Sequence, residues 1–220
     1  MGKGVLYKAN ASTWSKSQSK KFNATTISDG KVRHADAGTW YDNYPMEQLY
    51  TATFSANWSN GWRGDGVKLD EGVWQSNILV GSTTNYMGMW GFDQNAIQAF
   101  LAPNKDFGGV TSAKLWVNCY ETTTNGSPDV LIGKHSYTSE PSGTWNGANA
   151  DYGDSVLLHV PNQALGGYVV TLKTTQITLK DKRTAIGGIA IKGQEATNEN
   201  HGKFNGVNSY NTRLEITVLK

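Results

Sequence analysis

The chain has 220 residues, enough for one large β-domain or for a smaller domain with an extension. Aromatic residues make up 11% of the chain, which argues against disorder. Glycine fills 25 positions and charged residues reach only 17%, a composition that favours short strands joined by tight turns. The formal net charge of +2 argues against nucleic-acid binding, and no apolar run is long enough for a membrane-spanning helix, so no membrane insertion is expected.

A repeat with an offset of 26 residues marks the N-terminal part of the chain. Residues 4–14 read GVLYKANASTW, and residues 30–40 read GKVRHADAGTW. Each copy predicts a short strand, a turn of small residues and a second strand that begins with tryptophan. Such a hairpin is too small to bury its own face, so we expect it to pack on its twin or on another chain. The alternative is chance similarity within a biased composition.

Beyond Pro45 the sequence changes to the alternation of apolar and polar residues that is typical of β-strands. Strict alternation predicts one half-buried strand over residues 50–58, and turn residues predict a loop over residues 59–66. Further strands are expected within 67–80, 86–92, 113–120, 130–136, 155–160, 167–172, 185–191 and 212–218. One short helix is predicted over residues 93–101, where Asp93 is a good N-cap and Pro103 ends the apolar stripe.

These elements predict an all-β fold: a jelly-roll-like β-sandwich with one short helix, preceded by two small repeated β-hairpins. The boundary is expected near residues 44–49, which gives a hairpin region for attachment or assembly at 1–44 and a sandwich of the carbohydrate-binding kind at 45–220. The alternation also predicts a buried face, formed by Phe54, Leu115, Val117, Leu158, Val170, Ile189, Leu214 and Ile216.

Sequence signatures of an enzyme are missing: the chain has no HExxH, GxSxG, Walker or zinc-ligand motif. We therefore predict no catalytic residues, no metal ligands and no cofactor. His159 is predicted to point outward, because the apolar residues around it occupy the other face of its strand. Cys119, the single cysteine, excludes an intrachain disulfide and alternates with apolar residues, which predicts a thiol in the core.

Two roles for carboxylates stay open at this point. A glycoside hydrolase needs two carboxylates across a cleft, and the sequence leaves such a pair open among Asp65, Asp70, Glu71, Asp151 and Asp154. Asp151 and Asp154 are also candidates for oxygen ligands of a structural calcium ion. The alternative for all of them is a solvated position in a turn.

Aromatic residues beside turn residues are the most informative candidates for binding. Flat aromatic faces next to amide groups suit the apolar faces and hydroxyls of sugar rings. We predict ligand binding by four such residues, which are Trp62, Trp74, Trp145 and Tyr152. The alternative is that these rings close the ends of the sandwich or fill a subunit interface.

Three segments, taken in their order along the chain, carry a family resemblance. They are residues 85–93 (NYMGMWGFD) running on to Ile97 and Leu101, residues 132–142 (IGKHSYTSEPS), and the ending 186–191 (IGGIAI), 204–206 (FNG) and 212–217 (TRLEIT). Together they resemble the jelly-roll-like C-terminal modules of tail-fibre and minor structural proteins from phages of Gram-positive bacteria. The resemblance covers about residues 49–220. Residues 121–126 (ETTTNG) depart from a His- and aromatic-rich hairpin of that module, so no ligand role is predicted there.

The resemblance implies a non-enzymatic phage virion protein, most simply a tail-fibre or receptor-binding component that recognises a host-surface glycan. The N-terminal hairpins would join it to other virion proteins, and fibre proteins are usually trimers, so a homotrimer is expected. The N-terminus shows no signal peptide, which fits assembly of the virion in the host cytoplasm. One alternative is a head fibre or capsid decoration protein, and another is a bacterial carbohydrate-binding module or glycan hydrolase.

Overall fold

The computed structural model of the chain describes residues 24–28, 31–36, 39–45, 49–63, 65–69, 73–76, 86–102, 109–122, 127–145, 149–179, 181, 183–194 and 201–219, with the backbone alone for 24–45 and 73–76. The chain divides into two compact units, residues 1–48 and residues 49–220. This division falls at the interval of residues 44–49 that the change of sequence pattern indicates.

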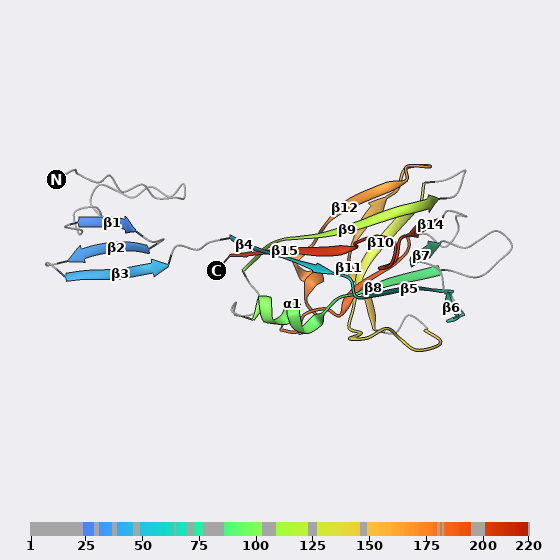
Figure 1. The fold of residues 1–220 in the computed structure, drawn as a ribbon, viewed down its shortest axis with the longest axis horizontal. Coiled ribbons are helices and arrows are strands. Elements are labelled where there is room, and N and C mark those ends of the chain that lie inside the picture. Colours follow the sequence, from blue (N-terminus) through green and yellow to red (C-terminus); the bar gives the residue numbers. More distant parts are fainter. Residues whose placement is uncertain are drawn as a thin grey trace. The chain divides into compact units, whose positions relative to one another are not determined.

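The N-terminal unit contains a three-stranded antiparallel sheet in the order β1-β2-β3, drawn in blue in Figure 1. Its strands are β1 (Ala24–Ser28), β2 (Lys31–Asp36) and β3 (Thr39–Pro45). The second copy of the repeat forms the β2–β3 hairpin, with Trp40 at the start of β3, as predicted. Strand β1 adds a third strand that the repeat does not predict, and the first copy lies outside the described residues.

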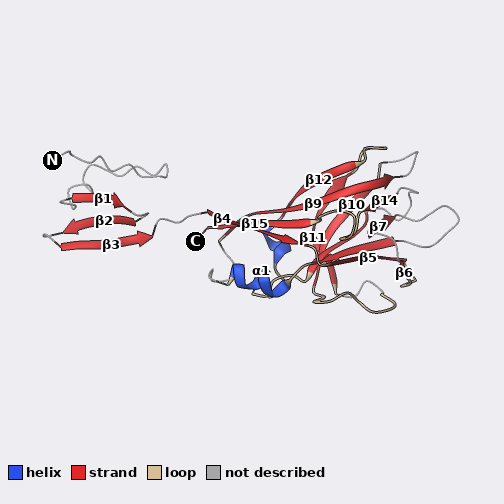
Figure 2. Cartoon of the chain, viewed as in Figure 1, coloured by secondary structure: helices blue, strands red, loops and turns tan. Residues whose placement is uncertain are grey.

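The second unit is a twelve-stranded antiparallel sheet with one short α-helix in the described residues, α1 (Gln94–Leu101), and one 3-10 helix, η3 (Thr174–Ile177) (Figure 2). The strands are β4 (Leu49–Ser55), β5 (Trp58–Arg63), β6 (Lys68–Leu69), β7 (Val73–Ser76), β8 (Tyr86–Gly91), β9 (Val110–Thr122), β10 (Asp129–His135), β11 (Ala150–His159), β12 (Gly166–Leu172), β13 (Gly188–Gly193), β14 (His201–Phe204) and β15 (Arg213–Leu219). No helix in the described part of the chain is long and apolar enough to cross a membrane.

The large sheet folds over on itself to make a sandwich. One layer runs β4-β15-β9-β12 and the other runs β11-β10-β13-β8-β5, while β14 and β7 pair with each other and link β9 to β8. Leu115 and Ile216 from the first layer share one buried cluster with Ile132 and Ile189 from the second layer. The predicted all-β sandwich with one short helix is therefore confirmed.

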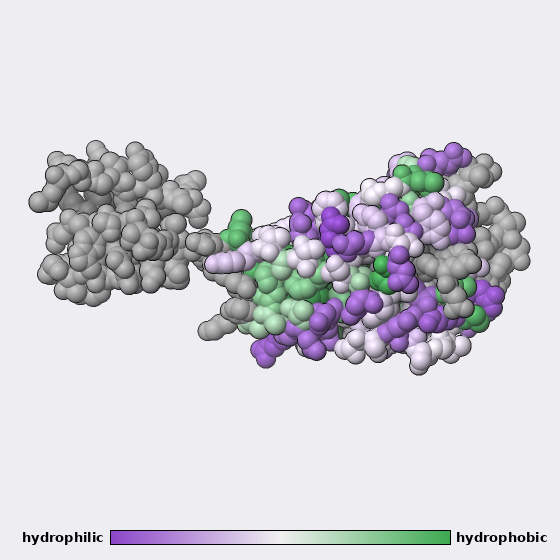
Figure 3. Space-filling model, viewed as in Figure 1, coloured by the Kyte–Doolittle hydropathy of each residue, from purple (hydrophilic) through white to green (hydrophobic). Residues whose placement is uncertain are grey.

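The predicted core is confirmed as well. Seven of its members are buried, namely Leu115, Val117, Leu158, Val170, Ile189, Leu214 and Ile216. Phe54 is partly buried and packs edge-to-face against Phe100 of α1, with ring centroids 5.8 Å apart, and Figure 3 shows apolar residues gathered around α1 and β4. Asp93 caps α1 by accepting a hydrogen bond from the Ala96 amide at 3.0 Å. Burial raises the pKa of the Cys119 thiol to about 11, which fits an inert thiol in the core.

The chain between β4 and β5 differs from the prediction of one strand followed by a loop. Strand β4 ends at Ser55, after which the Ala56 amide donates to the Thr212 carbonyl of one layer and the Asn57 amide donates to the Gly91 carbonyl of the other. The predicted loop over residues 59–66 is wrong for its first half, since residues 58–63 pair with β8. Ladder pairing and the burial of Trp62 outweigh the turn propensity of this segment.

We expect residues 46–220 to fold without the N-terminal unit. The buried core is drawn from residues after 49, and the β4–β15 ladder begins at Leu49 itself. A shortened chain of residues 46–220 should therefore show one cooperative thermal transition by circular dichroism, at a temperature close to that of the full chain. Loss of that transition would mean that the sandwich needs residues before 46.

Candidate functional site

A groove of about 530 Å³ opens where the chain crosses from one layer to the other. It is lined by residues 57–60 at the start of β5, by residues 206–209 of the β14–β15 loop, by Lys68 of β6 and by Glu140 of the β10–β11 loop. The groove exists because β4 and β5 belong to different layers, so the corner between them stands open beside the loop that precedes β15.

Hydrogen bonds hold the two walls of the groove together. The Ser59 hydroxyl accepts from the Val207 amide at 2.9 Å, which ties the β14–β15 loop to the start of β5. Within that loop, the amides of Ser209 and Tyr210 both donate to the Gly206 carbonyl. The groove is thus a preformed concavity, as small-ligand sites usually are.

One end of the groove is closed by a small charged network. Glu140 Oε1 accepts from Asn60 Nδ2 and from Lys68 Nζ, each at 2.9 Å. Partial burial of Glu140 favours its neutral form, but the hydrogen bonds from Lys68 and Asn60 prevail and hold the pKa of this carboxyl below its ordinary value. Glu140 is therefore an ionised hydrogen-bond acceptor at neutral pH and has no proton to donate.

Three exposed side chains of the groove have no hydrogen-bond partner in the described part of the chain: Asn57, Asn208 and Ser209. An asparagine amide offers both donors and an acceptor, and a serine hydroxyl does the same. The side chains of Asn60, Lys68, Glu140 and Ser59, which also line the groove, are already paired. The polar atoms of Asn57, Asn208 and Ser209 are those that a polar ligand would meet.

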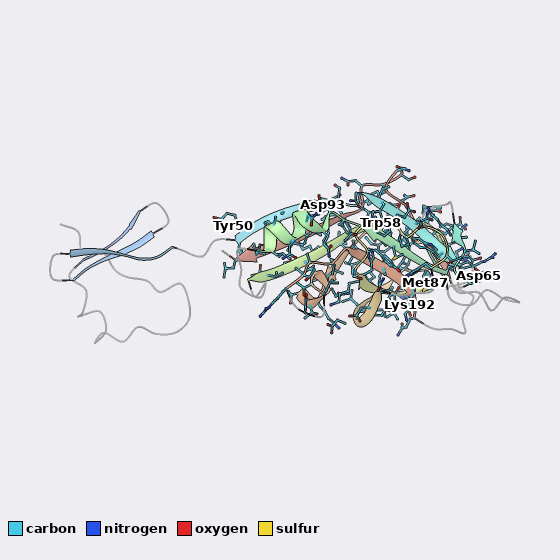
Figure 4. The ribbon with its side chains drawn as sticks, turned by 90° about the horizontal axis from the view of Figure 1, so that it is seen from below. Tyr50, Trp58, Asp65, Met87, Asp93 and Lys192 are labelled. Atoms are coloured by element: carbon cyan, nitrogen blue, oxygen red, sulfur yellow. The ribbon has the colours of Figure 1, made fainter. Side chains whose placement is uncertain are left out.

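Trp58 gives the groove its aromatic surface. The edge of its indole lies directly on Gly91, where a Cβ atom would come within 1.9 Å of the indole Cε2, so only glycine fits at that position. The indole also packs against the imidazole of His135, with ring centroids 5.3 Å apart. The Nε1 atom of Trp58, a residue labelled in Figure 4, is buried and has no hydrogen-bond partner in the described residues. Packing alone therefore holds the ring.

His135, whose ring packs against Trp58, is only 1% exposed. Its Nδ1 accepts from the Tyr137 amide at 3.2 Å, which requires that Nε2 carries the proton and donates to the Trp90 carbonyl at 3.0 Å. Burial lowers the pKa of His135 to about 4, while the bond to the Trp90 carbonyl opposes that change. The imidazole is therefore neutral at physiological pH, and its role is structural.

The structure brings three of the four predicted binding residues together, but in a buried cluster. Trp62 is 0% exposed and Trp145 is 2% exposed, and their rings pack edge-to-face with centroids 5.4 Å apart. Tyr152 packs against the same cluster, its ring lying over Gly133 and under the Lys192 ammonium at 4.4 Å. In Figure 4, Lys192 lies beside Met87, which packs against this cluster too.

This aromatic cluster lies on the outer face of the second layer, under the loop that follows β10. In β13, Ile189 and Ile191 enter the main core whereas Ala190 joins Trp62 and Trp145, so the two clusters occupy opposite faces of the strand. With both tryptophans buried, neither offers a ring face to a ligand. In the described residues the rings pack the loop onto the sheet, a role that neither the predicted ligand contact nor its stated alternative describes, and contact of the cluster with a ligand stays a prediction.

The other sequence candidates are more scattered. Trp74 lies in β7, where only the backbone is described. Asp65 forms an ion pair with Arg63 at 2.6 Å, which lowers the pKa of this carboxyl, whereas Asp70 and Glu71 lie outside the described residues. His159 is exposed, as predicted. Across the described ranges, no group of three or more His, Cys, Asp or Glu side chains could hold a metal ion.

The groove contains residues that sequence reasoning does not single out. Asn60, Asn208 and Ser209 are ordinary turn residues in the sequence, and Glu140 and Lys68 are too far apart along the chain to suggest an ion pair. The one available signal is Trp58, an aromatic residue immediately before the turn-rich segment. It becomes informative only once the chain is known to change layers there.

The sequence matches no protein-family model, and no curated protein is significantly similar to it.

Proposed function

We propose that the chain is a non-enzymatic phage virion protein, most simply a tail-fibre or receptor-binding component, whose sandwich binds a host-surface glycan in the groove. The observation that carries this proposal is the fixed indole of Trp58 beside the side chains of Asn57, Asn208 and Ser209, which have no hydrogen-bond partner among the described residues. The all-β sandwich and the resemblance to phage tail modules support it.

The chemistry of the groove suits a neutral sugar. A pyranose has an apolar face that can pack on an indole and hydroxyls that both donate and accept hydrogen bonds. The groove pairs one aromatic residue with amide and hydroxyl groups of that dual character, while its charged residues, Lys68 and Glu140, neutralise each other. A volume of about 530 Å³ leaves room for a short stretch of polysaccharide.

The same geometry supports binding over hydrolysis. Glycoside hydrolysis needs a proton donor and a second carboxylate at a set separation. Among the described residues that line the groove, Glu140 is the one acidic residue, and its hydrogen bonds keep it ionised. Hydrolysis in this groove is therefore not favoured, whereas a bacterial carbohydrate-binding module would use the groove in the same way.

In this proposal the chain functions as part of a fibre. Residues 1–44 would join it to other virion proteins, and the purified protein is expected to be a homotrimer. Light scattering should then give three times the chain mass of 24.0 kDa. A monomer would favour a head fibre, a capsid decoration protein or a free-standing module over a trimeric tail fibre.

Removing single groove side chains should weaken binding without unfolding the protein. We expect Asn208→Ala and Trp58→Ala each to weaken binding to purified Gram-positive cell-wall polysaccharide by about tenfold or more, because contacts at the centre of a site usually carry that much. Salt should change the affinity little, because the ligand is neutral. Binding isotherms at two salt concentrations provide the measurement.

Asn95→Ala is the matched control, since Asn95 is an exposed asparagine on α1, away from the groove. It should bind like the wild type. Wild-type affinity of both groove variants, each shown to be folded, would contradict the proposal. Release of reducing ends from the polysaccharide by the wild-type protein would instead favour the hydrolase.

A further inference from the structure

A second cavity, of about 410 Å³, shares no residue with the groove. It lies between β10, β11 and the segment around η3. The residues that define it are Lys134, Asp151, Asp154, Thr175 and Thr178. None of these residues belongs to the hydrophobic core or to the lining of the glycan groove.

An irregularity in β11 places two carboxylates at this cavity. The β10–β11 ladder pairs Ile132 with Val156 and then Lys134 with Asp151, so residues 152–155 lie opposite Gly133 alone. The Tyr152 ring fills the space over Gly133, where a Cβ atom would meet the ring at 2.6 Å. Bulges of this kind redirect side chains and are frequent beside functional sites. Here the bulge puts both Asp151 and Asp154 on the cavity wall.

The wall of the cavity also holds a buried ammonium group. Lys134 is 5% exposed, and its Nζ donates to the carbonyls of Thr175 at 2.8 Å and Thr178 at 2.7 Å. An ammonium has three hydrogens, so one N–H of Lys134 remains without an acceptor within the described ranges. Within the same ranges, neither Asp151 nor Asp154 forms an ion pair with the Lys134 ammonium. The ammonium already has two acceptors, and its third N–H is the one that a ligand could complete.

The carboxylates supply the complementary acceptors. Asp151 Oδ1 accepts from the Gly153 amide at 2.9 Å, which leaves its second oxygen available, and Asp154 is exposed with both oxygens available in the described part of the chain. Two carboxylates and one ammonium give the cavity a net negative charge, which repels an anionic ligand. The net charge attracts a cation, but a cationic group offers no acceptor to the remaining N–H of Lys134, whereas a neutral hydroxyl does.

We infer that this cavity is a second sugar-binding site, which takes a neutral pyranose through a pair of neighbouring hydroxyls. One hydroxyl accepts from the Lys134 ammonium, and both donate to the carboxylate oxygens of Asp154 and Asp151. The inference extends the proposed function, since a chain with two sugar sites can hold one polysaccharide at two points and so gain avidity.

The test is an NMR titration of the full chain labelled with nitrogen-15. Changes in the backbone amide chemical shifts show which residues respond to each sugar. The probes are glucose and galactose as neutral sugars, glucosamine as a cation and glucuronate as an anion, all at one ionic strength. We expect neutral sugars to shift the amides of residues 151–154 and 175–179. Asp154→Asn should weaken that response by about tenfold or more, because it removes a charged acceptor without a change in size. Glu215→Gln, the same change on β15, should leave it intact.

The outcomes separate this inference from the proposed function. Neutral-sugar shifts confined to residues 57–60 and 207–209 would overturn the second site and leave the groove proposal standing. Shifts confined to the cavity would support the second site and count against the groove. A cavity response to glucosamine or glucuronate alone would overturn the neutral class of ligand, and so would an unchanged response in Asp154→Asn. Absence of any shift with all four probes would overturn the inference altogether.

Discussion

Replacing Trp62 with alanine is expected to lower the free energy of unfolding by about 3–5 kcal/mol, which is the usual cost of removing a buried tryptophan. Trp62 is fully buried, packs edge-to-face on Trp145 and donates from Nε1 to the Gly143 carbonyl of the covering loop at 3.4 Å. The substitution therefore opens a cavity and releases that loop from the sheet. Urea unfolding of the full chain, followed by tryptophan fluorescence and circular dichroism, measures the loss.

A matched control comes from Val169→Ala on β12. Val169 is 49% exposed, so its truncation should cost less than about 0.5 kcal/mol. Polysaccharide binding by the folded fraction of Trp62→Ala is the second readout. If this variant keeps wild-type stability but loses binding, Trp62 contacts the ligand. That result would contradict a purely structural role for the buried ring.

Stability is also expected to fall steeply in mild acid because of His135. The folded protein keeps this imidazole neutral, with a pKa of about 4, whereas the unfolded chain takes up the proton near the ordinary value of 6.5. The contribution is fully present above pH 6.5 and is lost as the pH falls toward 4, because only the unfolded state binds the proton in that interval. The difference amounts to about 3 kcal/mol. Urea midpoints at a series of pH values measure it.

His135→Gln removes the titration while keeping an amide donor for the Trp90 carbonyl. This variant should lose stability at pH 7, because the Tyr137 amide loses its acceptor, but its stability should change much less between pH 6.5 and 4.5. The elements around His135 bring the rings of Trp58 and Tyr137, main-chain atoms and Gly188 to its imidazole. Carboxyls such as Glu140, whose pKa is lowered, respond only below about 4.5. Equal pH dependence in the variant and the wild type would contradict the assignment.

Much of the sandwich was predictable because its core strands alternate cleanly. In β15 the inward residues Leu214, Ile216 and Val218 are all buried. The start of α1 is predictable from its N-cap, Asp93. The exceptions have two causes. Strand β5 contains Asn60 and Gly61, which local preference assigns to a turn, yet its ladder with β8 and the burial of Trp62 decide otherwise. Strand β14 is only four residues long and has too few positions to show a period.

The candidate sites were less predictable, because each is assembled from segments far apart in the sequence. The groove joins Asn60 to Glu140 and Ser59 to Val207. Trp62 and Trp145 were expected at the surface because turn residues surround them, and nothing in the sequence indicates that the loop carrying Trp145 folds back over Trp62. Lys134 follows the segment Val130–Gly133 in β10, and its charge gives no sign in the sequence of the carbonyls that it reaches.

The course of β4 determines how the sandwich bears mechanical load. The strand starts at Leu49, where the second unit begins, and the chain enters the groove two residues after the strand ends at Ser55. Seven residue pairs join β4 to β15 along this path. Tension between residue 49 and a ligand in the groove therefore acts lengthwise along β4, and the hydrogen bonds of the ladder share it in shear. Tension between Leu49 and Leu219, which are partners at one end of the ladder, would instead peel the pairs apart one after another. A tether on the N-terminal side thus loads the sandwich in its stronger direction.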